Sequence, residues 1–471
     1  MIEGVKPYAE YKESDIPWAP AIPSSWQKER AKRLFTKMQR PVRPEDDVVT
    51  CFRDGMVTLR KNRRLRGFTE ATVFSGYQGI RKGDLVIHGM DAFAGAIGVS
   101  DSDGKGTPVY NVCKPGPGVV ARYYAHTVRE MSRAQWILAL AKGIRERSTD
   151  FRYEMFGNQF VPLPPPDEQA AIVRFLDHAN RKIDGFIRAK RKLIGLLNEQ
   201  KQAIIHRAVT RGLHPAVPLK PSGIPWLGDI PKHWEVPRVK QCARKISKGT
   251  TPSTEGRAIL ESGPVRFLKA ENISAGCITN KPLCFIDEET NRVIRRSQLA
   301  ENDILFVIAG ATLGKTAVVS GEILPANTNQ AVAFIRPNSR VVPRFLELWL
   351  QSPRIKELIW LNAVQSAQPN LSMADLGNFV TPVPPRNEQQ QILDFVKEAT
   401  KPMSDAIART EREIALMQEY RTRLTADLVT GKLDVREAAA KLPDLPTDAA
   451  APAEPLTDEA PEESETEEAE A

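Results

Sequence analysis

The stretch Pro162-Leu-Pro-Pro-Pro-Asp-Glu-Gln169 decides how this chain is organised, because it returns as Pro382-Val-Pro-Pro-Arg-Asn-Glu-Gln389, 220 residues later. Upstream of each copy, Ile16-Pro17-Trp18 recurs as Ile224-Pro225-Trp226 at an offset of 208. Two nested repeats define one unit of about 210 residues that is used twice, far longer than a solenoid period. The sequence therefore predicts a duplicated half-molecule, and duplex DNA is a common partner for proteins with two-fold pseudo-symmetry.

Each Pro-rich turn is expected to open a long helix, because proline is excluded from a helix interior. Asp167 and Asn387 are placed to cap these helices. Each helix would run for about 44 residues and about 65 Å, with apolar residues at steps of three, four and seven. The first seam comprises Ile172, Leu176, Ala179, Ile183, Ile187, Ile194, Leu197, Ile204 and Ala208, and the second Ile392, Val396, Ala399, Met403, Ile407, Ile414, Met417, Leu424 and Leu428.

Both seams need burial, and the simplest solution is that the helices pack on each other as an antiparallel coiled coil. That arrangement would place the two globular parts at opposite ends; two independent surface helices are the alternative. Each globular part contains strand-length runs and closing helical patches, at 123–144 and 343–361. The expected strands are Asp84–His88, Val109–Cys113, Val265–Leu268, Asp303–Ile308, Thr316–Ser320 and Ala331–Arg336.

The expected fold class is therefore α+β, with two mixed α/β domains separated by two long helices. The domain boundaries that we expect are 1–161 and 214–381 for the globular domains, 162–213 and 382–436 for the helices, and 437–471 for a disordered acidic tail.

Composition limits the functional classes. The chain has 471 residues and 41% hydrophobic content, and no apolar run approaches the ~18 residues that a membrane span requires. The five cysteines lack CxxC spacing and the six histidines form no close pair, so neither zinc nor disulfides are expected. We expect a cytoplasmic protein.

Net charge is unevenly distributed. Residues 437–471 contain twelve acidic residues and one lysine, a local charge of −11, so the total of +8 leaves +19 on residues 1–436. A body of that charge favours a polyanion through counterion release, although a merely soluble basic surface is the alternative. The acidic segment could screen this body against loose nucleic-acid binding.

The Walker-like segment Gly310-Ala-Thr-Leu-Gly-Lys-Thr316 has three residues where a phosphate-binding loop has four, and it lies between two expected strands. Asp54, Glu271 and Asp303 are isolated carboxylates, more consistent with solvated or capping roles than with a nuclease site. No methyltransferase tetrad is present, so the chain is expected to be non-catalytic. The candidate DNA-binding residues are Arg60, Lys61, Asn62, Arg63, Arg64 and Arg66 in the first half, and Lys248, Thr250, Thr251, Arg266, Lys269, Asn272, Lys315 and Gln330 in the second.

These repeats make the chain similar to the specificity subunits of type I restriction-modification systems, over nearly all of residues 10–436. Three second-half motifs carry the same resemblance: Gly249-Thr-Thr-Pro-Ser253, Gly310–Lys315 with Asn329-Gln330, and Gln368-Pro-Asn-Leu-Ser372. The first half departs from them, with Gly89-Met-Asp-Ala-Phe-Ala-Gly95 in place of Gly310–Gly314 and no clean match to Gln368–Ser372.

The resemblance implies that each globular domain recognises half of an asymmetric, bipartite DNA target, with the paired helices setting the gap between the halves. It also implies docking of two methyltransferase subunits and of motor-nuclease restriction subunits, which would use S-adenosylmethionine, ATP and magnesium; this chain would bind no cofactor itself. A coiled-coil scaffold without direct DNA readout, and a complete fused enzyme, are the rival functions. The residues expected in helical spacing and subunit docking are Glu168, Gln169, Ile172, Ile183, Ile187, Ile194, Glu388, Gln389, Ile392, Ile407 and Ile414.

Overall fold

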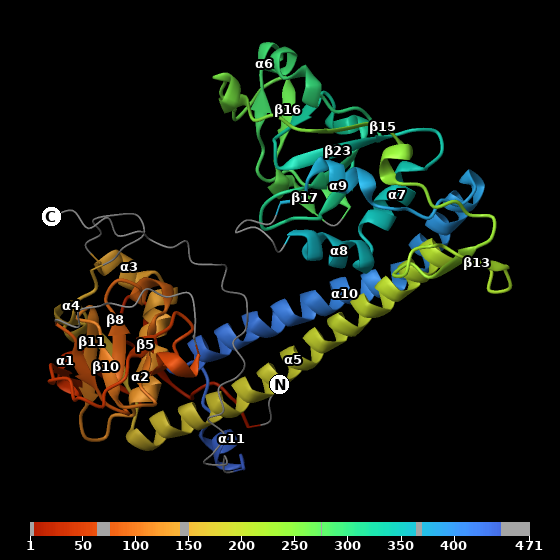
Figure 1. The fold of residues 1–471 in the computed structure, drawn as a ribbon. Helices are drawn as coiled ribbons and strands as arrows, with labels where there is room; N and C mark the ends of the chain where they lie inside the picture. The colour runs from red at the N-terminus through yellow and green to blue at the C-terminus, as the bar shows by residue number, and fades with distance from the viewer. Residues whose placement is uncertain (1–3, 64–75, 142–149, 275, 364–369, 444–471) are drawn as a thin grey trace. The chain divides into compact units, whose positions relative to one another are not determined.

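The computed structural model describes residues 4–63, 76–141, 150–274, 276–363 and 370–443. It divides into two compact units, called unit 1 and unit 2 below. Unit 1 combines residues up to Ala189 with residues from Glu413 onward, and unit 2 is Lys190–Arg412. The two long helices α5 (Pro166–Arg211) and α10 (Arg386–Val429) each contribute to both units. Figure 1 shows the elements of each unit.

Unit 1 is built around a four-stranded antiparallel sheet with the order β4-β11-β8-β9. Helix α2 packs against β8 and β9, and its Tyr123, Tyr124 and Val128 are fully buried. The remaining elements of the unit are short. The strands of unit 1 are β1 (Tyr11–Glu13), β2 (Ala21–Pro23), β3 (Gln27–Arg30), β4 (Phe35–Met38), β5 (Val49–Cys51), β6 (Val57–Leu59), β7 (Gln78–Ile80), β8 (Leu85–His88), β9 (Ile97–Val99), β10 (Gly104–Gly106), β11 (Tyr110–Pro115) and β12 (Phe160–Leu163), and its helices are α1 (Ala31–Leu34), η1 (Arg60–Asn62), η2 (Ala92–Ala94), α2 (Ala121–Arg133), α3 (Trp136–Leu140), α4 (Tyr153–Gly157) and α11 (Arg436–Ala440).

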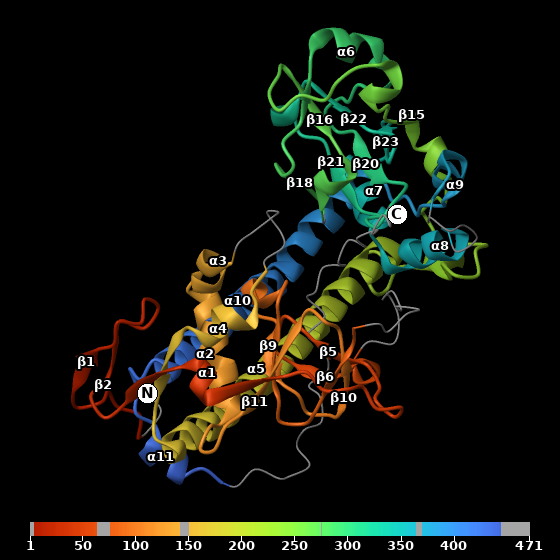
Figure 2. The same ribbon diagram turned by 90° about the vertical axis from the view of Figure 1, so that its left-hand side faces the viewer.

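Unit 2 repeats this sheet, with the order β15-β23-β20-β21 and antiparallel pairing throughout. Figure 2 shows its strands grouped beside α7. A second sheet, β19-β16-β22, contains a parallel pair, β16 with β22. The strands of unit 2 are β13 (Leu219–Pro221), β14 (Asp229–Pro231), β15 (Ala243–Lys248), β16 (Val265–Leu268), β17 (Ile273–Ser274), β18 (Cys277–Ile278), β19 (Phe285–Ile286), β20 (Ile304–Val307), β21 (Thr316–Val318), β22 (Ala326–Thr328) and β23 (Val332–Pro337), and its helices are η3 (Val239–Gln241), η4 (Pro252–Glu255), η5 (Ala270–Asn272), α6 (Glu288–Val293), η6 (Arg295–Ser297), η7 (Gly321–Ile323), α7 (Pro343–Leu350), α8 (Pro353–Ala363) and α9 (Met373–Asn378).

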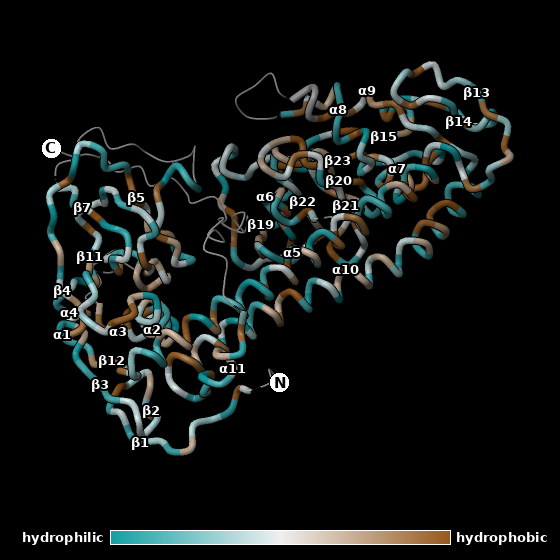
Figure 3. The backbone as a smooth tube through the Cα atoms, turned by 90° about the horizontal axis from the view of Figure 1, so that it is seen from below, coloured by the Kyte–Doolittle hydropathy of each residue, from teal (hydrophilic) through white to brown (hydrophobic). Residues whose placement is uncertain are grey.

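The long helices pack together within each unit, as the apolar seams predict. In unit 1, Ile172, Leu176 and Ala179 of α5 share a core with Leu424 and Leu428 of α10. In unit 2, the other end of α5 meets the start of α10, where one hydrophobic core includes Ile205, Ala208, Val209, Ile392 and Val396. The early part of each helix therefore packs on the late part of the other, which makes the pair antiparallel. Figure 3 shows hydrophobic and hydrophilic segments alternating along both helices.

Two polar residues interrupt the apolar seams, Lys201 in α5 and Arg421 in α10. In unit 1 the guanidinium of Arg421 pairs with Asp184. In unit 2 the Lys201 ammonium donates to the Ser404 hydroxyl at 3.0 Å. Both are polar contacts between α5 and α10, so these polar residues do not prevent the two helices from packing together.

Three local expectations need correction. The closing helical patches are each two helices, because the chain turns at Gln135 (φ 58°) after α2 and at Gln351–Ser352 after α7. Asp167 and Asn387 lie within the first turns of α5 and α10, so neither is the cap residue. The expected tail began at residue 437, yet α11 reaches Ala440 and buries Ala438 and Ala439 in the core of unit 1. Residues 444–471 lie outside the described residues. In the described part of the chain no helix has the length and apolarity that crossing a membrane requires.

Candidate nucleic-acid interface

Several candidate residues lie at one end of the unit 2 sheet, where its strands run into their connecting loops. The pairing places Lys248, Ala333, Phe306 and Thr316 in one row across the four strands. Beyond this row the chain forms loops, which we call the unit 2 loop edge: 249–251, 308–315 and 329–331. The register therefore brings together the Gly-Thr-Thr, Walker-like and Asn-Gln motifs, which are far apart in sequence.

The unit 2 loop edge carries cations that the fold does not neutralise. Lys248, Lys315 and Gln330 are all exposed. Neither lysine has a carboxylate within ion-pair distance among the described residues. Thr250 and Thr251 are half-buried, and the Thr250 amide donates to the Thr328 carbonyl at 3.0 Å. The edge thus presents ammonium and amide groups on a backbone that is held in place.

Glycine is required at two kinds of position here. A Cβ on Gly249 would lie 2.2 Å from the Thr328 carbonyl oxygen, so a larger residue would force β15 and β22 apart. Gly310 and Gly314 have φ values of 91° and 82°, a region that other residues rarely adopt. The Walker-like segment is thus a strand-to-strand loop between β20 and β21, with no helix N-terminus to bind phosphate.

The remaining unit 2 candidates differ in their availability. Lys269 follows β16, whose Leu268 carbonyl accepts from the Asn329 amide, so it borders the loop edge. Arg266 packs over the Phe285 ring at 5.7 Å. Asn272 is fully buried, and its amide donates to the Thr279 and Pro282 carbonyls at 3.1 and 2.7 Å. The structure thus gives Asn272 a folding role in place of the base-reading role that we expected.

The unit 1 basic cluster is largely used within the fold. The Lys61 ammonium pairs with Asp47 at 2.5 Å. Arg63 lies 4.3 Å from the centre of the Phe52 ring and pairs with Asp54 at 2.7 Å. The other members that are described, Arg60 and Asn62, bond the hydroxyls of Thr50 and Thr58. Arg64 and Arg66 lie outside the described residues, so the cluster is weaker support for a DNA contact than its sequence indicates.

Unit 1 has an equivalent loop edge, formed by 39–41, 89–96 and 107–109. The Gly89 amide donates to the Val109 carbonyl, and the Gly89 carbonyl accepts from the Phe151 amide. In unit 2, the Ile308 amide donates in the same way to the Ala331 carbonyl, and the Ile308 carbonyl accepts from the Leu371 amide. Phe151 is thus the structural counterpart of Leu371. Gln368 and Pro369 of the second-half motif lie outside the described residues. Its remainder, Asn370-Leu-Ser372, corresponds to Asp150-Phe-Arg152, where sequence comparison finds no signal.

The two loop edges differ in chemistry. Unit 1 exposes the apolar side chains of Met90 and Val109, at 42% and 38%. Behind them, Asp91 donates its amide to His88 Nδ1 at 3.1 Å and pairs with Arg53 at 3.0 Å. Two domains with one scaffold therefore present different surfaces at equivalent positions.

The repeated Glu-Gln pair explains why the Pro-rich motif occurs twice. Gln389 Oε1 accepts from the Val342 amide at 2.7 Å, and its Nε2 donates to the Pro384 and Arg340 carbonyls at 2.8 and 3.0 Å. Gln169 does the same with the Val120 amide and the Pro164 carbonyl, at 2.9 and 2.8 Å. Each glutamine thus forms a clamp, which joins the Pro-rich turn to the N-cap residue of α2 or α7.

The neighbouring glutamates anchor Trp26 and Trp234, a further pair of residues at the offset of 208. Trp26 Nε1 donates to Glu168 at 2.8 Å, and Trp234 Nε1 to Glu388 at 3.2 Å. Tyr8 also bonds Glu168, and burial together with this carboxylate raises the pKa of the Tyr8 hydroxyl. Glu168 and both glutamines are buried, so the structure gives them intramolecular roles in place of the docking role that we expected.

The expected spacer isoleucines fall into two groups. Ile172, Ile183, Ile187 and Ile392 are buried within their units. In the middle stretches of the helices, Ile194, Ile407 and Ile414 are half-buried. Docking of a partner subunit on these residues stays a prediction.

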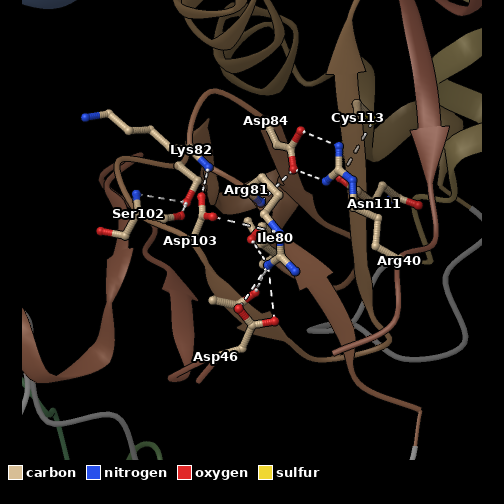
Figure 4. Close-up of polar contacts among 12 residues, drawn as sticks. Arg40, Asp46, Ile80, Arg81, Lys82, Asp84, Ser102, Asp103, Asn111 and Cys113 are labelled. Atoms are coloured by element: carbon tan, nitrogen blue, oxygen red, sulfur yellow. Dashed lines mark hydrogen bonds and ion pairs between the residues drawn. The ribbon is translucent and has the colours of Figure 1, made fainter. Parts of the chain in front are cut away.

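A buried aspartate fixes the start of the equivalent central strands. Asp84, before β8, accepts from the Arg81 amide at 2.8 Å and pairs with Arg40 (Figure 4). In unit 2, Asp303 accepts from the Ala300 amide at 2.8 Å and pairs with Arg336 at 2.7 Å. Asp303 is fully buried, so the solvated role is wrong. Its carboxylate holds the turn before β20 and does not cap a helix. No cluster of potential metal ligands occurs among the residues that the structure describes.

Repeated sheets, repeated clamps and a pair of antiparallel helices define a class of duplicated two-domain protein with a helical spacer. A family model described as the type I restriction modification DNA specificity domain matches residues 231–415. The chain is 27% identical over 315 residues to the type I restriction enzyme EcoBI specificity subunit of Escherichia coli, covering 62% of this chain and 65% of that one. It is 26% identical over 287 residues to the MjaVIII specificity subunit of Methanocaldococcus jannaschii, covering 60% and 64%.

The matched regions span just under two thirds of these relatives' lengths. A solved structure titled as the basis of complex assembly and conformational transition of the type I R-M system has the same fold, with a TM-score of 0.62 at 15% identity over 87% of this chain and 98% of that one. In sequence, the chain is thus similar to the specificity subunits of type I restriction-modification systems.

Proposed function

We propose that this chain recognises a bipartite, asymmetric DNA sequence through the loop edges of its two units. The observation that carries this proposal is the pair of equivalent loop edges on one repeated scaffold, with different side chains on each. The unpaired ammonium groups of Lys248 and Lys315 suit phosphate or guanine, and the Gln330 amide suits adenine. In unit 1, Met90 and Val109 suit apolar contact with a thymine methyl group.

The proposal extends to assembly. The half-buried middle stretches of α5 and α10 would dock two methyltransferase subunits, and restriction subunits would join them. Those partners would supply S-adenosylmethionine, ATP and magnesium chemistry, while this chain would act in the cytoplasm as a non-catalytic specificity factor. The names of the matched relatives and the basic body of the chain support this view. A scaffold without DNA readout is the alternative, and the exposed cations at the unit 2 loop edge favour recognition over it.

A domain exchange tests the proposal. Residues 10–161 would be replaced by those of a relative, and the methylated sequence would be read by methylome sequencing of the host. Only one half of the modified sequence should change. A change in both halves, or in neither, would contradict the assignment. A chain that methylates DNA when purified alone would establish the fused-enzyme rival.

A further inference from the structure

A groove of about 880 Å³ lies within unit 1, between the edge strand β9, helix α2 and the first half of α5. Its lining includes Lys82, Arg129, Arg181, Asp101 and His126. The groove lies away from the loop edge of unit 1, although Val120, the partner of Gln169, is part of its lining. A volume of this size is within the range of ligand sites, which is roughly 300–1,000 Å³.

The groove has an excess of positive charge once internal ion pairs are removed. Two lining pairs are neutral: Arg122 binds Asp177 through two bonds of 2.6 and 2.7 Å, and Asp184 binds Arg421. Of the rest, Lys82 and Arg181 are exposed and have no carboxylate partner among the described residues. Figure 4 shows Lys82 bonding Asp103 through its backbone amide, with its ammonium outside the network.

Arg129 is the least satisfied cation of the groove. Among the described residues, its guanidinium donates a hydrogen bond to a backbone carbonyl, that of Asp54. Burial, and then the charge of Arg133, lowers the pKa of Arg129 to about 10. A guanidinium that loses water without gaining a carboxylate is costly to the fold. Among the described lining residues, one carboxylate is outside an ion pair and could offset these three positive charges. This is Asp101, which accepts a hydrogen bond from the Ser102 hydroxyl at 2.6 Å.

The chain supplies a matching anion close to the groove. Residues 444–471 contain eleven carboxylate side chains and no lysine or arginine. Leu442, two residues before this segment, accepts a hydrogen bond from Arg174 on α5. Arg181 follows Arg174 by seven residues on the same helix, two turns along the same face, about 10 Å away. A segment of 28 residues can extend to about 90 Å, so it reaches the groove easily.

We propose that the acidic C-terminal segment, residues 444–471, binds in this groove and pairs with Lys82, Arg129 and Arg181. Bound there, the segment neutralises an anion-attracting site that lies outside the loop edge. Its effect is to lower the affinity of unit 1 for unrelated polyanions, so that charge attraction is concentrated where the sequence is recognised. The binding itself does not depend on the proposed DNA function.

Two measurements on the full-length chain test the proposal without DNA. Carbodiimide cross-linking followed by mass spectrometry should join the Lys82 amine to carboxylates within 444–471, and the yield should fall as salt is raised. Glu-specific proteolysis of the segment should accelerate at least fivefold in a Lys82→Glu, Arg181→Glu double variant. The matched control is Lys182→Glu with Arg188→Glu, which changes the net charge equally at exposed α5 positions outside the groove.

Several results would overturn the proposal. Equal proteolysis in the two double variants, or cross-links from the segment spread evenly over other lysines, would show that the groove is not its site. If the segment stays accessible and a short DNA duplex protects Lys82 from amine modification, the groove is a nucleic-acid site instead. Failure of the domain exchange would leave these outcomes unchanged, so the two proposals fail separately.

Discussion

Replacing Gln389 by alanine should loosen unit 2 at one defined place, the start of α7. The amide of Gln389 makes three buried hydrogen bonds, at 2.7, 2.8 and 3.0 Å, to Val342, Pro384 and Arg340. Alanine leaves these backbone groups without their partner, at about 1 kcal/mol or more each. The total is about 3 kcal/mol, which corresponds to roughly a 100-fold increase in local opening.

Hydrogen exchange read by mass spectrometry measures that opening. Peptides that contain Val342 should exchange roughly 100-fold faster in the variant, while those that contain Val120, the equivalent residue of unit 1, should not change. Gln390→Ala is the matched control, because Gln390 is exposed and, among the residues that the structure describes, its side chain bonds only Asp394 of the same helix, at 3.1 Å. Exchange at Val342 that is equal in the two variants would refute the clamp role of the repeated glutamine.

Three other predictions follow from the described contacts. Lys248→Ala and Lys315→Ala should each weaken DNA binding to all sequences and reduce the steepness of log affinity against log salt by about one. Lys61→Ala is the control and should leave the slope unchanged, because the Lys61 ammonium is already paired. A larger effect of Lys61→Ala would reverse the assignment. Burial raises the pKa of Glu347. The folded state therefore holds the proton more tightly than the unfolded state, and stability falls as pH rises above the ordinary pKa of 4.5. In thermal unfolding, the stability of Glu347→Gln relative to the native chain should increase between pH 5 and pH 8, and a constant difference would contradict this. Inserting one helical turn near Asn198 should lengthen the unread gap in the methylated sequence, and an unchanged gap would reject the helices as its determinant.

The sequence predicted the features that depend on local pattern. The apolar seams identified two long helices that pack together, and the alternating runs located β8, β11, β16, β20, β21 and β23. The Glu-Gln repeat marked an important place, although its clamp role needed coordinates, because its partners Val120 and Val342 lie 49 and 47 residues away. Long-range pairing of this kind leaves no local signature.

The same reason explains where the site predictions differ from the structure. Asn272 has the residue type of a base reader, yet its partners are carbonyls seven and ten residues along the chain. The cations Lys61 and Arg63 look available in sequence, and the fold brings Asp47 and Asp54 to them. In unit 1, Phe151 can be identified as the counterpart of Leu371 from its backbone hydrogen bond with Gly89, and not from the residues beside it in the sequence.

Unit 1 is assembled from both ends of the chain, and this has a consequence during synthesis. Leu424, Leu428, Val429, Val435, Ala438 and Ala439 complete a core whose other buried members lie between Tyr8 and Ala179. The Lys6 and Asp434 backbones also pair with each other. Domains usually form in the order in which the ribosome releases them. Here the later unit, contiguous over Lys190–Arg412, can form first, while the earlier one must wait for the last residues to emerge. A stop codon near residue 420 would therefore damage the half of the protein made at the beginning.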